Sequence, residues 1–256
     1  MKENKGKFLK VICYSGGIVA LCGILYIANG LVGNPISRVL VSLVANEYIR
    51  EHYQQLELER GKVGFNFKTG KYSVPLYSKK SQDTHFELYY NHLGKLSHTS
   101  YEWIIQNTWR RFREELKVYG YALADEKLGE DYHLVLMIDD EKHPWGEGDV
   151  VVLDQEVDLK NYPFDVEVIA EYLGTETPSY ELAYRVLEEV HKVMVEETFH
   201  ISKYGVLAME QLEGVTEERG QSYEQGLAIY EIPPTLFEEE NPIKVLEDCD
   251  KRGRIE

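Results

Sequence analysis

Residues 11–28 have the sequence VICYSGGIVALCGILYIA, and no charged residue occurs from Val11 to Ser37. An α-helix needs about 20 predominantly apolar residues to cross the hydrocarbon layer of a membrane. The rest of the chain is polar and contains no second stretch of this kind. The sequence therefore predicts a transmembrane helix over residues 11–33, with a water-soluble body after it.

The residues before this stretch predict its orientation. Cationic flanks of a membrane helix stay on the cytoplasmic side, and four lysines precede the apolar run: Lys2, Lys5, Lys7 and Lys10. We expect residues 1–10 to form a cytoplasmic tail of a single-pass protein of the cell membrane, with an extracytoplasmic body. A cleaved signal peptide has the same basic start, but its apolar region is usually only about 7–15 residues long. The one candidate cleavage triplet, Ala28-Asn29-Gly30, is poor, so we expect an uncleaved signal anchor.

The body is strongly acidic. The whole chain carries 28 Lys and Arg against 44 Asp and Glu. Without the four lysines and one glutamate that precede residue 34, the body holds 24 basic and 43 acidic residues. Such a charge repels nucleic acid and anionic lipid headgroups. We therefore expect the bilayer to be contacted through residues 11–33 and nucleic acid to be excluded as a partner.

The cysteines predict a body without an intrachain disulfide. Cys13 and Cys22 lie inside the apolar run, so that Cys249 is alone in the body. This count excludes the disulfide-rich secreted folds. Because Cys249 lies near an acidic chain end, we expect no cationic neighbour that would activate its thiol.

The fold class predicted for the body is α+β, with a helix packed on an antiparallel meander in a first domain over residues 34–124. After Asn34-Pro35, apolar residues recur at helical spacing and form the face expected to cover the sheet: Ile36, Val39, Leu40, Leu43, Val44 and Tyr48. Turn signals at 68–71 and 91–94 separate the expected strands. These strands are 63–67, 72–77, 86–90 and 95–97.

A long helix ends this domain. Thr99 and Glu102 have the spacing of a capping box, and Gly120 is a candidate stop. The expected buried stripe is Ile105, Trp109, Phe112, Leu116 and Tyr119.

A second α+β domain is predicted for residues 125–256. The alternation of apolar residues indicates a strand at 132–138, followed by an acidic loop at 139–149. The later elements are expected in this order: a short strand at 150–153, a helix from Phe164 to Leu173 that ends at Gly174, a helix that starts at Thr177-Pro178, and strands at 204–209 and 227–232. The helix after Pro178 buries Leu182, Ala183, Val186, Leu187, Val190, Val193 and Met194, whereas Pro233-Pro234 and the charged tail at 251–256 are expected to be frayed.

Several short motifs of the first domain resemble a known family: Asn34-Pro35-Ile36-Ser37, Phe65-Asn66-Phe67-Lys68, Tyr72 and Ser81-Gln82-Asp83-Thr84-His85-Phe86. They are similar to the YfjL-like proteins of Bacillus and its relatives. The resemblance implies one N-terminal transmembrane helix and an exported two-part α+β body, and it brings no catalytic residue. The helix and meander also resemble PepSY-type and cystatin-like modules, which implies a link to the inhibition or regulation of proteases.

Three groups of residues are candidates for chemistry. His85, His92 and His98 would form a zinc or copper site if adjacent strands brought them together, but we expect surface and turn histidines. The acidic loop 139–149 has oxygen ligands for calcium but lacks the EF-hand pattern, so we expect a solvated loop. Ser81, Asp83 and His85 have the residue types of a hydrolase triad without a nucleophile elbow, and we expect a local turn network.

These observations favour a non-enzymatic protein. The prediction is a membrane-anchored, exported binding or scaffolding protein of the cell envelope, with no catalytic, cofactor-binding or metal residue assigned. Its partner would be another envelope protein or a small ligand. Two alternatives stay open: a cell-envelope hydrolase or a regulator of one, and a ligand sensor that acts through a partner in the membrane.

Overall fold

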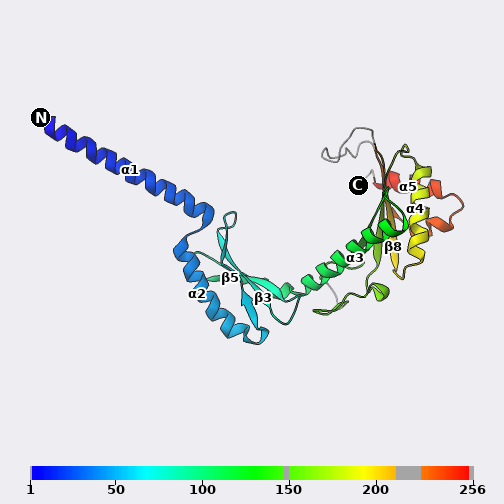
Figure 1. Ribbon diagram of the computed structural model, residues 1–256, viewed down its shortest axis with the longest axis horizontal. Coiled ribbons are helices and arrows are strands. Elements are labelled where there is room, and N and C mark those ends of the chain that lie inside the picture. The colour runs from blue at the N-terminus through cyan, green and yellow to red at the C-terminus, as the bar shows by residue number, and fades with distance from the viewer. Residues whose placement is uncertain (1, 147–149, 212–225, 254–256) are drawn as a thin grey trace. The chain divides into compact units, whose positions relative to one another are not determined.

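The structure is a computed structural model, and it describes residues 2–146, 150–211 and 226–253 (Figure 1). The chain forms two compact units, Met1–Asn107 and Thr108–Glu256. Each unit has its own β-sheet, and each combines helices with antiparallel strand pairs. The α+β class predicted from the sequence is therefore confirmed.

Two helices begin the first unit, α1 (Lys2–Val32) and α2 (Pro35–His52). Gly33 separates them with a positive φ of 78°, a conformation that glycine adopts without steric cost. Asn34 then caps α2, because its side-chain oxygen accepts a hydrogen bond from the Ile36 backbone N–H at 2.8 Å. Pro35 occupies the first turn, where its missing N–H would have no helical partner.

The N-terminal helix is a candidate membrane span. Among the described residues, one helical stretch is long and apolar enough to cross a membrane by length and composition, and it lies near the N-terminus within Tyr14–His52. A signal sequence meets the same test. The described side chains of α1 are almost all exposed, so the unit itself does not cover this apolar surface.

The first unit contains the helix and antiparallel meander that the sequence predicts. Its strands are β1 (Leu58–Arg60), β2 (Gly64–Asn66), β3 (Lys71–Ser78), β4 (His85–Tyr90) and β5 (Leu96–Thr99). They follow the order β1-β3-β4-β5, and β2 also pairs with β3. The core between α2 and the sheet consists of Val41, Ala45, Tyr53, Tyr72, Val74, Leu76, Phe86, Leu88 and Tyr90.

The face of α2 that covers the sheet differs from the predicted one. The helix buries Ser37, Val41 and Ala45 instead of the expected stripe. Of that stripe, Val44 and Tyr48 are partly buried at the edge of the core, whereas Ile36, Val39, Leu40 and Leu43 are exposed. Small side chains let a helix approach a sheet closely, so Ser37 and Ala45 suit the contact better than the larger residues do.

The helix α3 (Ile105–Lys127) follows a short 3-10 turn, Tyr101–Trp103. Its buried stripe agrees with the prediction at Trp109, Phe112 and Leu116. The predicted capping box is wrong, because Thr99 lies in β5 and accepts a hydrogen bond from the Tyr101 backbone N–H.

Gly120 does not end this helix. It is buried in the middle of α3 against strand β6 (Tyr132–Ile138), and a Cβ atom there would lie 2.6 Å from the Leu134 carbonyl oxygen. The glycine therefore allows close packing of helix on strand. The boundary between the two compact units falls inside α3, between Asn107 and Thr108.

The second unit is a four-stranded mixed sheet with the order β6-β7-β8-β9. Its other strands are β7 (Val166–Gly174), β8 (Ile201–Glu210) and β9 (Gly226–Ile232). The β7 and β8 strands are parallel, and α4 (Tyr180–Val195) connects them. Six of the seven positions expected to be buried on α4 are buried, and Val193 is half-buried. The six are Leu182, Ala183, Val186, Leu187, Val190 and Met194.

Four predictions for this unit are wrong. Residues 166–174 form a strand and not a helix, and 150–153 do not form a strand. The region after Pro233 is ordered as a 3-10 turn, Pro234–Glu238, and as α5 (Pro242–Gly253), which packs on β9 and α4. Pro178 precedes the helix that it was expected to open, because Ser179 is the N-cap.

Candidate functional site

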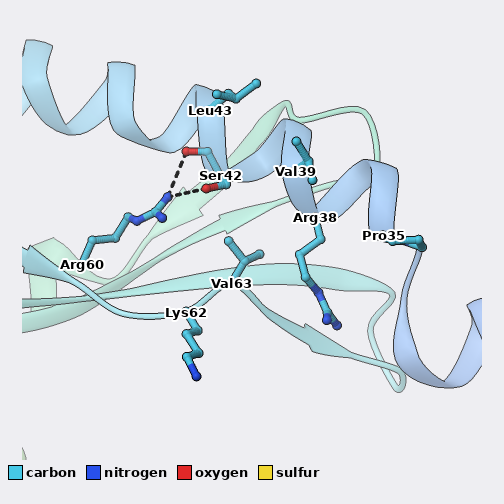
Figure 2. Close-up of a pocket in the computed structure, with 8 residues that line it drawn as sticks. All are labelled: Pro35, Arg38, Val39, Ser42, Leu43, Arg60, Lys62 and Val63. Carbon is cyan, nitrogen blue, oxygen red and sulfur yellow. Dashed lines mark hydrogen bonds between the residues drawn. The ribbon is translucent and has the colours of Figure 1, made fainter.

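A groove of about 540 Å³ lies between α2 and the segment that joins β1 to β2 (Figure 2). It is lined by Pro35, Arg38, Val39, Ser42, Leu43, Arg60, Lys62 and Val63. Three of these residues are cationic, four are apolar and none is acidic. The groove therefore matches a ligand that is partly apolar and carries negative charge.

Arg60 fixes one wall of this groove. It faces Leu76 in the register between β1 and β3, which places its side chain on the face of the sheet that α2 covers. Its guanidinium donates to the Ser42 carbonyl oxygen at 2.9 Å and to the Ser42 hydroxyl at 2.8 Å. Arg60 thus holds the middle of α2 to the edge of the sheet (Figure 2).

Arg38 and Lys62 supply the other two cations, and both are exposed. The Arg38 Nη2 donates to the Val32 carbonyl oxygen at 2.8 Å, at the last turn of α1. Within the part of the chain that the structure describes, no ion pair links Arg38, Arg60 or Lys62 to a carboxylate. Their charges are available to an external anion, and arginine binds phosphate and carboxylate groups through paired N–H donors.

An exposed apolar surface continues the groove along α2. Ile36 is 77% exposed, Val39 and Leu43 are each 62% exposed, and Leu40 is 38% exposed. With Pro35 they line a second, shallower depression of about 440 Å³. Further along the helix, the exposed positions are polar or charged: Asn46, Glu47, Arg50 and Glu51. The apolar outer face is thus confined to the half of α2 next to α1, and we call Ile36, Val39, Leu40 and Leu43 the outer apolar face.

The end of α1 is fastened to the sheet beside this groove. The Tyr72 hydroxyl oxygen accepts a hydrogen bond from the Asn34 backbone N–H at 2.7 Å. Gly33 lies against Phe65, with so little space that a Cβ atom would be 2.6 Å from the Phe65 Cγ. The groove is therefore held close to the point where the candidate membrane span ends.

Charge is distributed unequally between the two units. Residues 34–107 carry nine Lys and Arg against seven Asp and Glu, whereas residues 108–256 carry 15 against 36. The acidic character expected for the whole body therefore belongs to the second unit. The expected repulsion from anionic headgroups does not apply to the first unit, and in particular not to its groove.

The three histidines considered as metal ligands are not brought together. His85 and His98 face Tyr77 and Tyr89 in the register of β4 with its neighbours, and His92 lies in the turn between β4 and β5. His85 and the partner of His98 are four residues apart on β4, which corresponds to roughly 13 Å. Across the described residues, no group of three or more His, Cys, Asp or Glu side chains is arranged to hold a metal ion.

Ser81, Asp83 and His85 form a backbone turn. The Ser81 hydroxyl oxygen accepts a hydrogen bond from the Thr84 backbone N–H at 2.9 Å, and the His85 N–H donates to the Asp83 carbonyl oxygen at 3.1 Å. The Asn107 amide donates to the carbonyl oxygens of Asp83 and His85, both at 2.8 Å. The predicted turn network is present around these residues.

In the described part of the acidic loop, residues 139–146, the carboxylates contact the loop backbone and neighbouring elements. Asp139 is buried and accepts hydrogen bonds from the backbone N–H groups of Glu141 and Lys142, while Asp140 pairs with Arg113. Residues 147–149, which include two acids considered as calcium ligands, lie outside the described residues. This loop is therefore tied to its own backbone and to α3.

Asp165 is the centre of a polar cluster that sequence reasoning missed. Its Oδ2 lies 2.8 Å from the His143 Nε2, and its Oδ1 contacts the Lys142 ammonium at 3.1 Å and the His200 imidazole. Burial alone would raise the pKa of Asp165, but hydrogen bonds with His143, Lys142 and His200 outweigh it and lower the pKa to about 2. The carboxylate is therefore a charged structural link between the loop, β7 and the start of β8.

Cys249 differs from expectation because it is buried in α5 and has a cationic neighbour. An Arg252 Nη2–H group lies 3.0 Å from its sulfur, and the thiol is 3.8 Å from the Glu231 carbonyl oxygen. The expectation of a thiol without a cationic neighbour was wrong, because α5 places Arg252 one turn after Cys249.

The first unit is thus a helix-on-meander module with an apolar N-terminal helix. Residues 8–100 match the family model described as the YfjL-like N-terminal domain, and the resemblance drawn from the motifs of this region is confirmed. The matched range starts inside α1 and covers α2 and all five strands of the first sheet. No curated protein and no solved structure matches this chain.

Proposed function

We propose that this chain is a membrane-anchored binding protein of the cell envelope, with its N-terminus in the cytoplasm and both units outside. It acts by binding and not by catalysis, and the groove on the first unit is its binding site. The observation that carries this proposal is the placement of three cations and an apolar surface directly beside the end of α1.

The orientation is supported by the lysines that precede the apolar run. Positively charged segments are retained on the cytoplasmic side during insertion, so that Lys2 to Lys10 would remain inside and residues after Gly33 would be exported. Protease added to intact cells or spheroplasts tests this directly on the full-length chain. Digestion of the second unit supports export, and full protection of it until the membrane is broken contradicts export.

The chemistry of the groove supports a ligand with an anionic group and an apolar part. Arg38 and Arg60 each present planar N–H donors, and Lys62 adds a flexible ammonium group. Val39, Leu43 and Val63 provide the apolar contact. A purely hydrophobic ligand would leave the cations without a partner, and a small inorganic anion would leave the apolar wall in water.

The binding site is tested by photo-crosslinking in intact cells. A photoreactive amino acid replaces Val63 in the groove, or Tyr77 as a matched exposed site on the other face of the sheet. We expect adducts from position 63 that fall at least tenfold when Arg38 and Lys62 are both changed to glutamate. The same adducts from both positions would contradict a binding groove.

A further inference from the structure

We propose that the outer apolar face of α2 lies in the surface of the bilayer that holds α1, with Arg38 and Lys62 bound to anionic lipid headgroups. The inference rests on the proposed anchorage, and it names the occupant of the groove: the headgroup layer of the same membrane. The first unit would then be held flat against the membrane and not suspended from a flexible stalk.

The length of α1 places the start of α2 in the headgroup region. From Val11 to Val32 a helix that rises 1.5 Å per residue is roughly 33 Å long, which is close to the hydrocarbon thickness of about 30 Å. The chain therefore leaves the hydrocarbon layer near Val32. Because Gly33 and Asn34 alone separate the two helices, α2 starts in the headgroup region.

The exposed surface of α2 changes from apolar to polar with increasing distance from α1. From Ile36 to Leu43 its exposed positions are apolar apart from Arg38, and this part covers roughly 10 Å of helix. From Asn46 to Glu51 the exposed positions are polar or charged. Interfacial helices bury their apolar face about 5–10 Å into the boundary between headgroups and acyl chains. The apolar part of α2, which is the half next to the end of α1, is therefore the part that can lie in this boundary.

The charges near this face are complementary to an anionic surface. Arg38, Arg60 and Lys62 face the groove, and basic residues near a membrane surface are attracted by anionic lipids over about one Debye length. The nearest acids on these elements point elsewhere or are already paired. Glu47 pairs with Arg50 and Glu57 with Lys80, while Glu59 faces Tyr77 on the opposite side of the sheet.

The same surface has two further features of an interfacial site. Its cations lie at the border of the apolar face. Their long side chains can therefore reach the headgroups while the aliphatic part of each side chain lies along apolar surface. The contacts of Asn34 with Tyr72 and of Gly33 with Phe65 fix α2 relative to the end of α1. The outer apolar face is thereby kept next to the membrane.

The test uses the full-length chain in vesicles, with its three cysteines changed to alanine and one new cysteine labelled with an environment-sensitive fluorophore. The labelled variants are Val39→Cys on the outer apolar face and Tyr77→Cys as the exposed control. Vesicles contain phosphatidylcholine alone or with about one third phosphatidylglycerol. Quenchers attached to the lipid acyl chains are compared with iodide in the aqueous phase.

We expect the fluorophore at position 39 to be quenched by the lipid-attached group at least fivefold more strongly than the one at position 77, most strongly in anionic vesicles. Changing Arg38 and Lys62 to glutamine is expected to abolish the anionic enhancement and to leave the value in phosphatidylcholine unchanged. Equal iodide quenching at both positions would overturn the inference. Disulfide-linked dimers through unlabelled position 39 would also overturn it, because the occupant would be a second copy.

The result separates this inference from the proposed function. If the chain stays in the vesicles after an alkaline wash while position 39 faces water, the anchored binding protein stands and the lipid occupant is wrong. If the wash removes the chain from the vesicles, the anchorage is wrong, and both proposals fall together.

Discussion

Replacement of Gly33 by alanine is expected to loosen the junction between α1 and the first sheet. Gly33 has a φ of 78° and lies against Phe65, with a Cβ position 2.6 Å from Cγ and 3.0 Å from Cβ of that residue. These Phe65 atoms lie close to the backbone, so rotation of the ring cannot remove the overlap. Either the backbone or the helix end must move.

The size of the effect follows from two separate costs. A non-glycine residue in the left-handed region costs about 1–2 kcal/mol, and overpacking of a tight contact typically costs about 1–3 kcal/mol. Allowing for partial relaxation, we expect Gly33→Ala to destabilise the folded junction by about 2–4 kcal/mol. Since every 1.4 kcal/mol is a factor of ten, this corresponds to amide exchange that is about 30- to 700-fold faster.

Hydrogen exchange of the full-length protein in vesicles measures this change in peptides that cover β3. The strand is coupled to the junction because the Tyr72 hydroxyl binds the backbone of Asn34. Two control variants separate the cost of the positive φ from the cost of the contact with Phe65. Gly70→Ala changes a residue with a positive φ of 65° at which an added Cβ would meet no atom within 4 Å. Gly30→Ala changes a residue within α1 at which an added Cβ would also meet no atom within 4 Å.

We expect the effects to increase in the order Gly30, Gly70, Gly33. An equal effect at Gly33 and Gly70 would show that the contact with Phe65 has no energetic cost. No effect at Gly33 would refute the argument that the junction is rigid, and with it one support for a first unit that is held against the membrane.

Two further predictions concern the second unit. Asp165→Asn is expected to cost about 1–2 kcal/mol of unfolding free energy at pH 7 after allowance for solvent screening. Because the pKa of Asp165 is lowered from 3.8 to about 2, the stabilisation by its carboxylate is present above pH 4 and is lost as the pH falls through 2. Denaturant curves of the variant and the parent should therefore converge near pH 2. Gly120→Ala gains helix propensity of about 1 kcal/mol, but the overlap with the Leu134 carbonyl outweighs it, and we expect a net loss of about 1–2 kcal/mol in the same assay. A variant as stable as the parent would contradict either argument.

The first sheet was predictable because its signals are local. Turn residues at 68–71 and 91–94 separate segments that alternate in polarity, and β3 and β4 then pair as neighbours in the chain. Strand β1 was missed, because Arg60 lies on its inward face and the segment therefore shows no apolar alternation. The candidate groove was missed for another reason. Arg38 and Arg60 are far apart in sequence, and only the packing of α2 on the edge of β1 brings them to one site.

In strand β7, burial on both faces of the sheet hides the two-residue alternation that identifies a strand. Val166, Val168, Ala170 and Tyr172 are buried on one face, and the residues between them are half-buried on the other. Because Ile169 and Leu173 are apolar as well, the segment also contains apolar residues at spacings of three and four, which is the pattern of a helix. The central position of β7 between β6 and β8 resolves the ambiguity, and this position is a property of the whole sheet.

The helix α2 carries the more general consequence. Apolar periodicity identifies the face of a helix that avoids water, and in a soluble protein that face is the core. Next to a membrane anchor, a helix has two apolar environments available. In α2 the sheet takes the face with small residues, Ser37 and Ala45, while the larger residues Ile36, Val39 and Leu43 face outward. The helix thus has more large apolar residues than its contact with the sheet uses, and these residues end two turns from the anchor. A second apolar surface, outside the protein, explains this arrangement.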